Sequence, residues 1–174
     1  MDRLEKIRNA VKAKEEKEKQ EALEASQKEN NLFDKLKSLL PRVQELCKLI
    51  RELDKNKLLK EHESANNYGK DFFTDGISHR IGFSYVHNAS TWLDLGYEHL
   101  GLFSWDDGKD NHNKPRVGAI GSEGGGWSNY NVVLTEDGKV LYNGKDYIST
   151  MEWIVKDFDK FEKRVFDFID NLEG

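Results

Sequence analysis

The chain has 174 residues and a formal net charge of −5, with 34% charged residues and 37% in the hydrophobic class. This size predicts one compact domain with an extension rather than two large domains. No stretch approaches the roughly 18 apolar residues that a membrane helix needs, and residues 1–19 are too charged for a secretory signal. The single cysteine, Cys47, excludes an internal disulfide, fits a cytoplasmic protein and is expected to be a buried, inert thiol.

Charge is divided unevenly along the chain. Residues 1–65 hold 16 Lys and Arg against 14 Asp and Glu, a net +2, whereas residues 66–174 hold 11 against 18, a net −7. An acidic region repels the phosphate backbone of nucleic acids. We therefore expect the partner of this region to be a protein with a basic surface rather than DNA or RNA.

Residues 1–63 are predicted to form a long helical arm. Residues 4–29 lack Gly and Pro and consist mainly of strong helix formers. A short apolar seam at helical spacing consists of Leu4, Ile7 and Val11. Two interpretations stay open: a solvated helix, or a homodimeric coiled coil whose seam also includes Leu23.

Within the arm, Asn30 and Asn31 predict a break, and Pro41 predicts a kink or the first turn of a new helix. A stronger stripe at three- and four-residue spacing follows: Leu32, Phe33, Leu36, Leu39, Leu40, Val43, Leu46, Cys47, Leu49, Ile50 and Leu53. This stripe is expected to pack on the following domain or to pair with a second copy. Polar residues from Asp54 onward predict that the helix ends near Lys60.

Residues 66–174 are predicted to form an antiparallel sheet packed against a C-terminal amphipathic helix, which makes the fold class α+β. Alternating or short apolar segments predict strands over 77–86, 97–105, 116–120, 130–134 and 139–142. In the first of these, alternation puts five residues on one face: Ile77, His79, Ile81, Phe83 and Tyr85. Between the last two, Glu136-Asp137-Gly138 gives the clearest hairpin signal.

The last element is predicted to be a helix of about six turns. Ser149 and Glu152 have the spacing of a capping box at its start. Its wide apolar face consists of Met151, Ile154, Val155, Phe158, Phe161, Val165, Phe168, Ile169 and Leu172. Trp153 lies off this face, so we expect it to be exposed and available for a protein contact.

Candidate metal chemistry is confined to one acidic segment, with Asp106, Asp107, Asp110 and His112. The segment lacks the oxygen spacing, the glycine and the final glutamate of a calcium loop. No histidines have the i, i+4 spacing of a helical zinc site. The sequence therefore predicts no metal and no cofactor, and a metal-dependent hydrolase is kept only as a third alternative.

A small-ligand site is the second alternative. His79 beside Arg80 could bind a phosphate, although a half-buried strand position also explains the pair. Glycines at 121–126 precede Trp127, but no Lys-Ser or Lys-Thr follows as in a phosphate loop. A flat, nucleotide-like signal lying against Trp127 or Trp105 remains compatible with this pattern.

Two short motifs carry a resemblance: LPRVQEL at residues 40–46 and DGISHRIGF at residues 75–83, followed by a glycine-rich strand and a closing amphipathic helix. Over about residues 35–174 the chain resembles small uncharacterised proteins of phages and mobile elements of gut Firmicutes. The resemblance carries no established activity and no functional residues. It implies an accessory gene in a bacterial host, where acidic, compact proteins are often inhibitors of host defence, anti-CRISPR proteins among them.

The leading hypothesis is a non-enzymatic, protein-binding inhibitor of a bacterial defence system, such as an anti-CRISPR protein acting on a Cas nuclease complex. Its acidic region would meet a basic surface, with the loop carboxylates Asp106, Asp107 and Asp110 steering the encounter. Trp105 and Trp153 are the expected apolar anchors.

Overall fold

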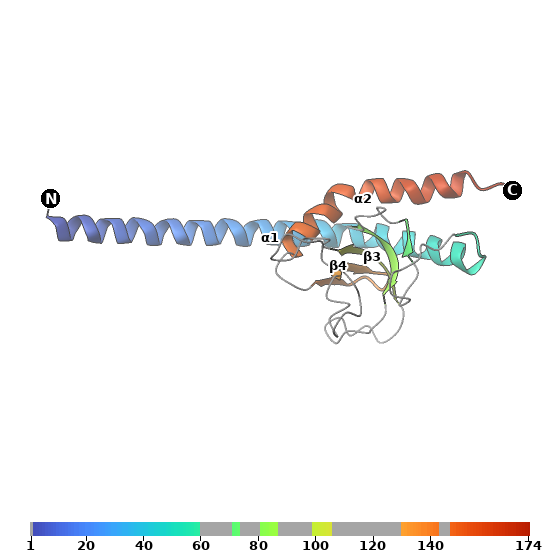
Figure 1. Cartoon of the computed structure of the whole chain (residues 1–174), viewed down its shortest axis with the longest axis horizontal. Helices are drawn as coiled ribbons and strands as arrows, with labels where there is room; N and C mark the ends of the chain where they lie inside the picture. Colours follow the sequence, from blue (N-terminus) through green and yellow to red (C-terminus); the bar gives the residue numbers. More distant parts are fainter. Residues whose placement is uncertain (1, 60–70, 74–80, 87–98, 106–129, 143–146) are drawn as a thin grey trace, which may run out of the picture.

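A computed structural model of the chain describes residues 2–59, 71–73, 81–86, 99–105, 130–142 and 147–174. The elements are α1 (Arg3–Lys55), β1 (Asp71–Phe72), β2 (Ile81–Val86), β3 (His99–Trp105), β4 (Tyr130–Thr135), β5 (Val140–Tyr142) and α2 (Tyr147–Asp170). The strands lie in the order β1-β2-β3-β4-β5, and each is antiparallel to its neighbours. The predicted α+β class, with an antiparallel sheet, a C-terminal helix and a long N-terminal helix, is confirmed (Figure 1).

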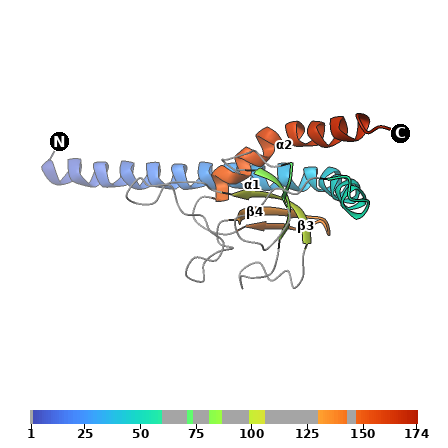
Figure 2. The same ribbon diagram turned by 45° about the vertical axis from the view of Figure 1, so that its right-hand side comes forward.

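Helix α1 is a single continuous element (Figures 1 and 2). Asp2 caps it, since its carboxylate accepts a hydrogen bond of 3.3 Å from the backbone N–H of Leu4. The predicted break at Asn30 and Asn31 is wrong, because both residues are helical. Asparagine disfavours a helix by less than about 1 kcal/mol, so packing of the adjacent apolar stripe outweighs this local preference.

Pro41 also lies inside α1, with helical residues on both sides, so the prediction that it starts a new helix is wrong. The helix ends at Lys55 with Asn56 as its C-cap, earlier than the predicted end near Lys60. Lys57, with a φ of 57°, has left the helical conformation.

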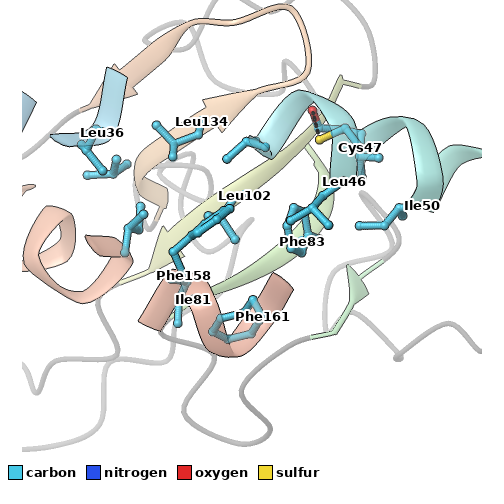
Figure 3. Packing of buried hydrophobic residues seen from close by; sticks show 14 of the residues in the cluster. Leu36, Leu46, Cys47, Ile50, Ile81, Phe83, Leu102, Leu134, Phe158 and Phe161 are labelled. Atoms are coloured by element: carbon cyan, nitrogen blue, oxygen red, sulfur yellow. Dashed lines mark hydrogen bonds between the residues drawn. The ribbon is translucent and has the colours of Figure 1, made fainter. Parts of the chain in front are cut away.

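The core lies between one face of the sheet and the two helices (Figure 3). The stripe of α1 packs on the sheet domain as predicted, and so its second half belongs to the same core as residues 71–174. The fully buried members from α1 include Leu36, Leu46 and Ile50. The sheet contributes Phe72 of β1, Ile81, Phe83 and Tyr85 of β2, Leu100 and Leu102 of β3, and Val132 and Leu134 of β4. The predicted shared face is confirmed for Ile81, Phe83 and Tyr85, while Ile77 and His79 lie outside the described residues.

Helix α2 covers the rest of the core with Met151, Ile154, Phe158, Phe161 and Val165, all buried as predicted. It begins at Tyr147, so Ser149 and Glu152 lie inside its first turns and the predicted capping box is wrong. The helix ends at Asp170, which leaves Leu172 outside the element and 40% exposed.

The hairpin of β4 and β5 is confirmed at the predicted place. Gly138 has a φ of 84°, a conformation that glycine adopts without steric cost. The backbone N–H of Thr135 donates to Lys139 at 2.9 Å, and that of Gly138 donates to Thr135 at 3.0 Å. The strand predicted over 116–120, and the ends of those predicted over 77–86 and 97–105, lie outside the described residues.

Candidate functional site

Most of the side chains that the sequence singled out lie outside the described residues: His79, Arg80, Asp106, Asp107, Asp110 and Trp127. These stay predictions. Trp105 ends β3, and its side chain is also outside the description. Trp153 lies on α2 and is half-buried rather than exposed, since it is only one position from the buried Ile154.

The feature that the structure adds is the N-terminal half of α1. This half projects from the domain, and the two chain ends lie at opposite ends of the molecule (Figure 1). Every residue from 2 to 28 is exposed, and Leu32 is the first buried residue of α1. We call residues 3–28 the free arm. At about 1.5 Å per residue it is roughly 40 Å long, and it adds no side chain to the core.

The free arm exposes aliphatic side chains. Leu4 is 59% exposed, Ile7 60% and Val11 50%. Residues 18 apart lie in line after about five helical turns. This periodicity places Ala22 in line with Leu4, Ala25 with Ile7, and Glu29 with Val11. We call the side of α1 that carries these six residues the seam face.

Leu23 does not belong to the seam face. It is 53% exposed, but it lies roughly 120° around the helix from Val11. The predicted seam that included Leu23 is therefore wrong, because three- and four-residue steps were not continued across the charged segment. Leu23 provides a matched control for the seam face, because its side chain has a similar exposed fraction but lies on a different side of the helix.

Three aromatic rings meet at the base of the free arm. The Tyr142 ring lies 5.0 Å from that of Phe33 and 4.9 Å from that of Tyr147. The Tyr147 hydroxyl donates to Glu29 Oε1 at 2.7 Å, and this hydrogen bond raises the pKa of Tyr147. Because Glu29 is on the seam face, this aromatic cluster stands at the end of that face. Its outer member, Tyr142, is 48% exposed.

Ion pairs set the direction in which the free arm leaves the domain. Near its base, Lys28 Nζ lies 2.7 Å from Glu152 Oε1 of α2. Farther along α1, Arg42 pairs with α2 and Arg51 pairs with Glu136 of the hairpin turn. These contacts fix α1 to α2 and to the sheet on two sides.

A shallow groove lies between the arm base and α2. Its lining includes Glu24, Gln27, Lys28, Asn31, Lys35 and Glu152. Apart from Leu32, the lining residues are charged or carry an amide, unlike the mostly hydrophobic and aromatic residues that line small-molecule pockets. Within the described ranges, no group of three or more His, Cys, Asp or Glu side chains could hold a metal ion.

Cys47 is confirmed as a buried thiol. Its Sγ lies 3.9 Å from the carbonyl oxygen of Leu100, and its side chain is 1% exposed. Burial, together with the nearby Glu136 carboxylate, raises the pKa of Cys47. The thiol therefore stays protonated, which makes it a poor nucleophile.

The described part of residues 71–174 is strongly acidic. It carries ten Asp and Glu against five Lys and Arg, which leaves a net −5. Several of these carboxylates, such as Asp170 and Glu173, are exposed on α2 or just beyond it. Much of the negative charge is thus carried by α2 and the β4–β5 hairpin, where the structure describes it.

Neither helix in the described part of the chain has a stretch long and apolar enough to cross a membrane. No protein-family model, curated protein or solved structure matches the chain.

Proposed function

We propose that the protein is a non-enzymatic, protein-binding inhibitor that occupies a basic surface of a nuclease complex in a bacterial defence system. The observation that carries the proposal is the division of the molecule into an acidic folded domain and a helical arm that is absent from its core. The acidic domain supplies the contact with the target, and the arm is free for a contact with protein.

Charge supports a basic target. Of the net −5 in the described part of the domain, α2 contributes a net −2, with six Asp and Glu against four Lys and Arg, and its outer side is exposed. Nucleases that bind DNA or RNA present clusters of Lys and Arg to the phosphate backbone. An acidic protein that covers such a cluster competes directly with the nucleic acid, and long-range attraction speeds their encounter.

Charge alone gives encounter rather than lasting affinity, because it is screened over roughly 8 Å at physiological ionic strength. Apolar anchors are needed to hold the complex. Trp153, half-buried on α2, is the anchor that we assign from the described residues. We propose that the inhibitor acts in the cytoplasm of a bacterial host, as the resemblance to proteins of phages and mobile elements implies.

The test uses purified Cas nuclease complexes from Firmicutes, with binding kinetics and target-DNA cleavage measured side by side. We expect one complex to bind the protein and to lose cleavage when the protein is stoichiometric. Raising the salt concentration should slow association far more than it speeds dissociation. Cleavage of nucleic acid by the protein alone, or no binding to any complex, would contradict the proposal.

Charge variants make this test specific. Asp170→Asn with Glu173→Gln should lower the association rate, and so should Asp106→Asn with Asp107→Asn and Asp110→Asn. The matched variant Lys156→Gln with Lys160→Gln removes exposed cations from the same helix and should raise that rate. Melting temperatures should stay unchanged throughout, because exposed charges contribute little to stability. Equal association rates for all variants at both low and high salt would exclude electrostatic steering.

A further inference from the structure

We infer that two copies of this chain pair through their free arms, side by side and antiparallel. This inference goes beyond the proposed function, since it concerns self-association and needs no nuclease. It rests on the exposed seam face, on the distribution of charge along the arm, and on the aromatic cluster at the arm base.

The charge distribution selects the orientation. Residues 2–14 carry five Lys and Arg against two Asp and Glu, a net +3, whereas residues 15–29 carry three against six, a net −3. In an antiparallel pair, the basic half of each arm lies along the acidic half of the other. A parallel pair would place like charges together, which is destabilising.

The heptad pattern sets the register. With Leu4 at position a and Ile7 at position d, the a series continues through Glu18 and Ala25, and the d series includes Lys14. An antiparallel pair packs a against d. In the register that best pairs opposite charges, Ile7 lies opposite Ala25 of the second copy and Lys14 lies opposite its Glu18. The same register places Val11 opposite Glu21.

The Ile7–Ala25 and Lys14–Glu18 pairings are both favourable. The small Ala25 side chain lets the helices approach where Ile7 is bulky. Lys14 and Glu18 already face each other within one arm, with Lys14 Nζ 3.9 Å from Glu18 Oε1. Two antiparallel arms therefore bring two lysines and two glutamates together in two neighbouring layers. Such polar layers specify the register of coiled coils.

The end of the overlap coincides with the start of the domain. The same register puts Leu4 of one copy beside Lys28 and Glu29 of the other. Glu29 is the residue that Tyr147 of α2 contacts, and the exposed ring of Tyr142 stands next to it. Leu4 would cover this aromatic cluster, and the arm would end before it meets the sheet. The length of the free arm thus matches the space available along a second arm.

The dimer is expected to be weak, because each arm offers only three large aliphatic side chains and its interface falls in the small class, below about 1,200 Å². Sedimentation velocity of the full chain, from micromolar to near-millimolar concentration, should show a monomer–dimer equilibrium that high salt shifts toward monomer. Ile7→Glu should abolish the dimer, whereas the control Leu23→Glu should leave it unchanged.

Cross-linking tests the orientation. In a Cys47→Ala background, oxidation of a mixture of Ile7→Cys and Ala25→Cys chains should give a cross-linked heterodimer, while Ile7→Cys alone should give little. Efficient cross-linking of Ile7→Cys with itself would overturn the antiparallel pair. A protein that stays monomeric at every concentration would overturn the inference. A monomer whose free arm binds vesicles of anionic lipid would overturn it as well. None of these outcomes depends on nuclease binding, so they test self-association independently of the proposed function.

Discussion

Arg42 of α1 holds Glu162 of α2 in a two-pronged ion pair. Its Nε lies 2.9 Å from Glu162 Oε2, and its Nη2 lies 2.6 Å from Glu162 Oε1. The same guanidinium reaches Asp159 at 2.8 Å and stacks 4.6 Å from the ring centroid of Phe158. The two carboxylates raise the pKa of Arg42, so the side chain is charged wherever the protein is folded. The Arg42 side chain thus joins the two helices through Glu162, which is 120 positions away in the sequence.

Replacing this side chain should destabilise the helix pair. Arg42→Ala is expected to lower the free energy of unfolding by about 1–2 kcal/mol, because it removes the paired hydrogen bonds and a cation–π contact. Arg42→Lys keeps the charge but cannot form the two parallel hydrogen bonds to Glu162. Its free energy of unfolding should therefore lie between those of the wild type and Arg42→Ala. Urea unfolding followed by circular dichroism measures both; equal midpoints for all three would show that the ion pair contributes nothing.

The buried face of α2 should be far more sensitive than its outer face. Phe161→Ala is expected to cost about 3–5 kcal/mol, since the ring is fully buried and its removal leaves a cavity. Phe158→Asp or Phe161→Asp should unfold the domain, because an unpaired charge would enter the core. Phe166, 41% exposed on the same helix, is the control: Phe166→Ala should change stability by less than about 1 kcal/mol. Thermal melts would contradict this if Phe161→Ala and Phe166→Ala behaved alike.

The free arm should be dispensable for folding. Among the described residues, deleting residues 1–29 removes no buried side chain, and the contacts with α2 that it removes include those of Lys28 and Glu29. The shortened chain should therefore melt within a few degrees of the full chain. Deleting residues 1–40 also removes Leu32 and Leu36 from the core and should unfold the domain. If the shorter deletion also gave insoluble protein, the arm would have to be part of the folding unit.

Stability should fall at high pH through Tyr85. Burial, and the Asp54 carboxylate that accepts from its hydroxyl at 3.2 Å, raise the pKa of Tyr85 to about 12. A tyrosine in the unfolded chain titrates near pH 10, so the folded state holds this proton more tightly. The stabilisation is complete below about pH 10 and is lost as pH rises toward about 12. Phenolate absorbance should show a group that titrates near pH 12 and that Tyr85→Phe removes. Titration of that group near pH 10 in the wild type would contradict the assignment.

Strong local patterns predicted much of the fold. Asp137-Gly138 located the β4–β5 hairpin, since glycine is the residue that readily adopts the φ of 84° found there. The three- and four-residue spacing located the buried face of α2, because burial of a helix follows its period. Predictions based on local preferences that are weak compared with the packing energy were wrong. Asn30 did not break α1, and Ser149 did not cap α2.

The candidate surface was only partly predictable. The sequence indicated Leu4, Ile7 and Val11, but it could not show that α1 remains one helix through Asn30 and Asn31. Without that continuity, the alignment of the seam face with Phe33 at the arm base is undefined. The aromatic cluster at the arm base combines Phe33, Tyr142 and Tyr147 from three different elements, and no spacing along the chain indicates such a meeting.

The order of α1 before α2 in the chain affects synthesis. The apolar stripe of α1, with Leu36, Leu46 and Ile50, leaves the ribosome about 110 residues before Phe158 and Phe161 of α2, which cover it. At about 5–20 residues per second, translation of the intervening chain takes roughly 5–20 s. Throughout that time the stripe lacks its cover from α2 and is a potential binding site for a chaperone. The strongly charged free arm, attached directly ahead of it, keeps the nascent chain solvated until α2 arrives.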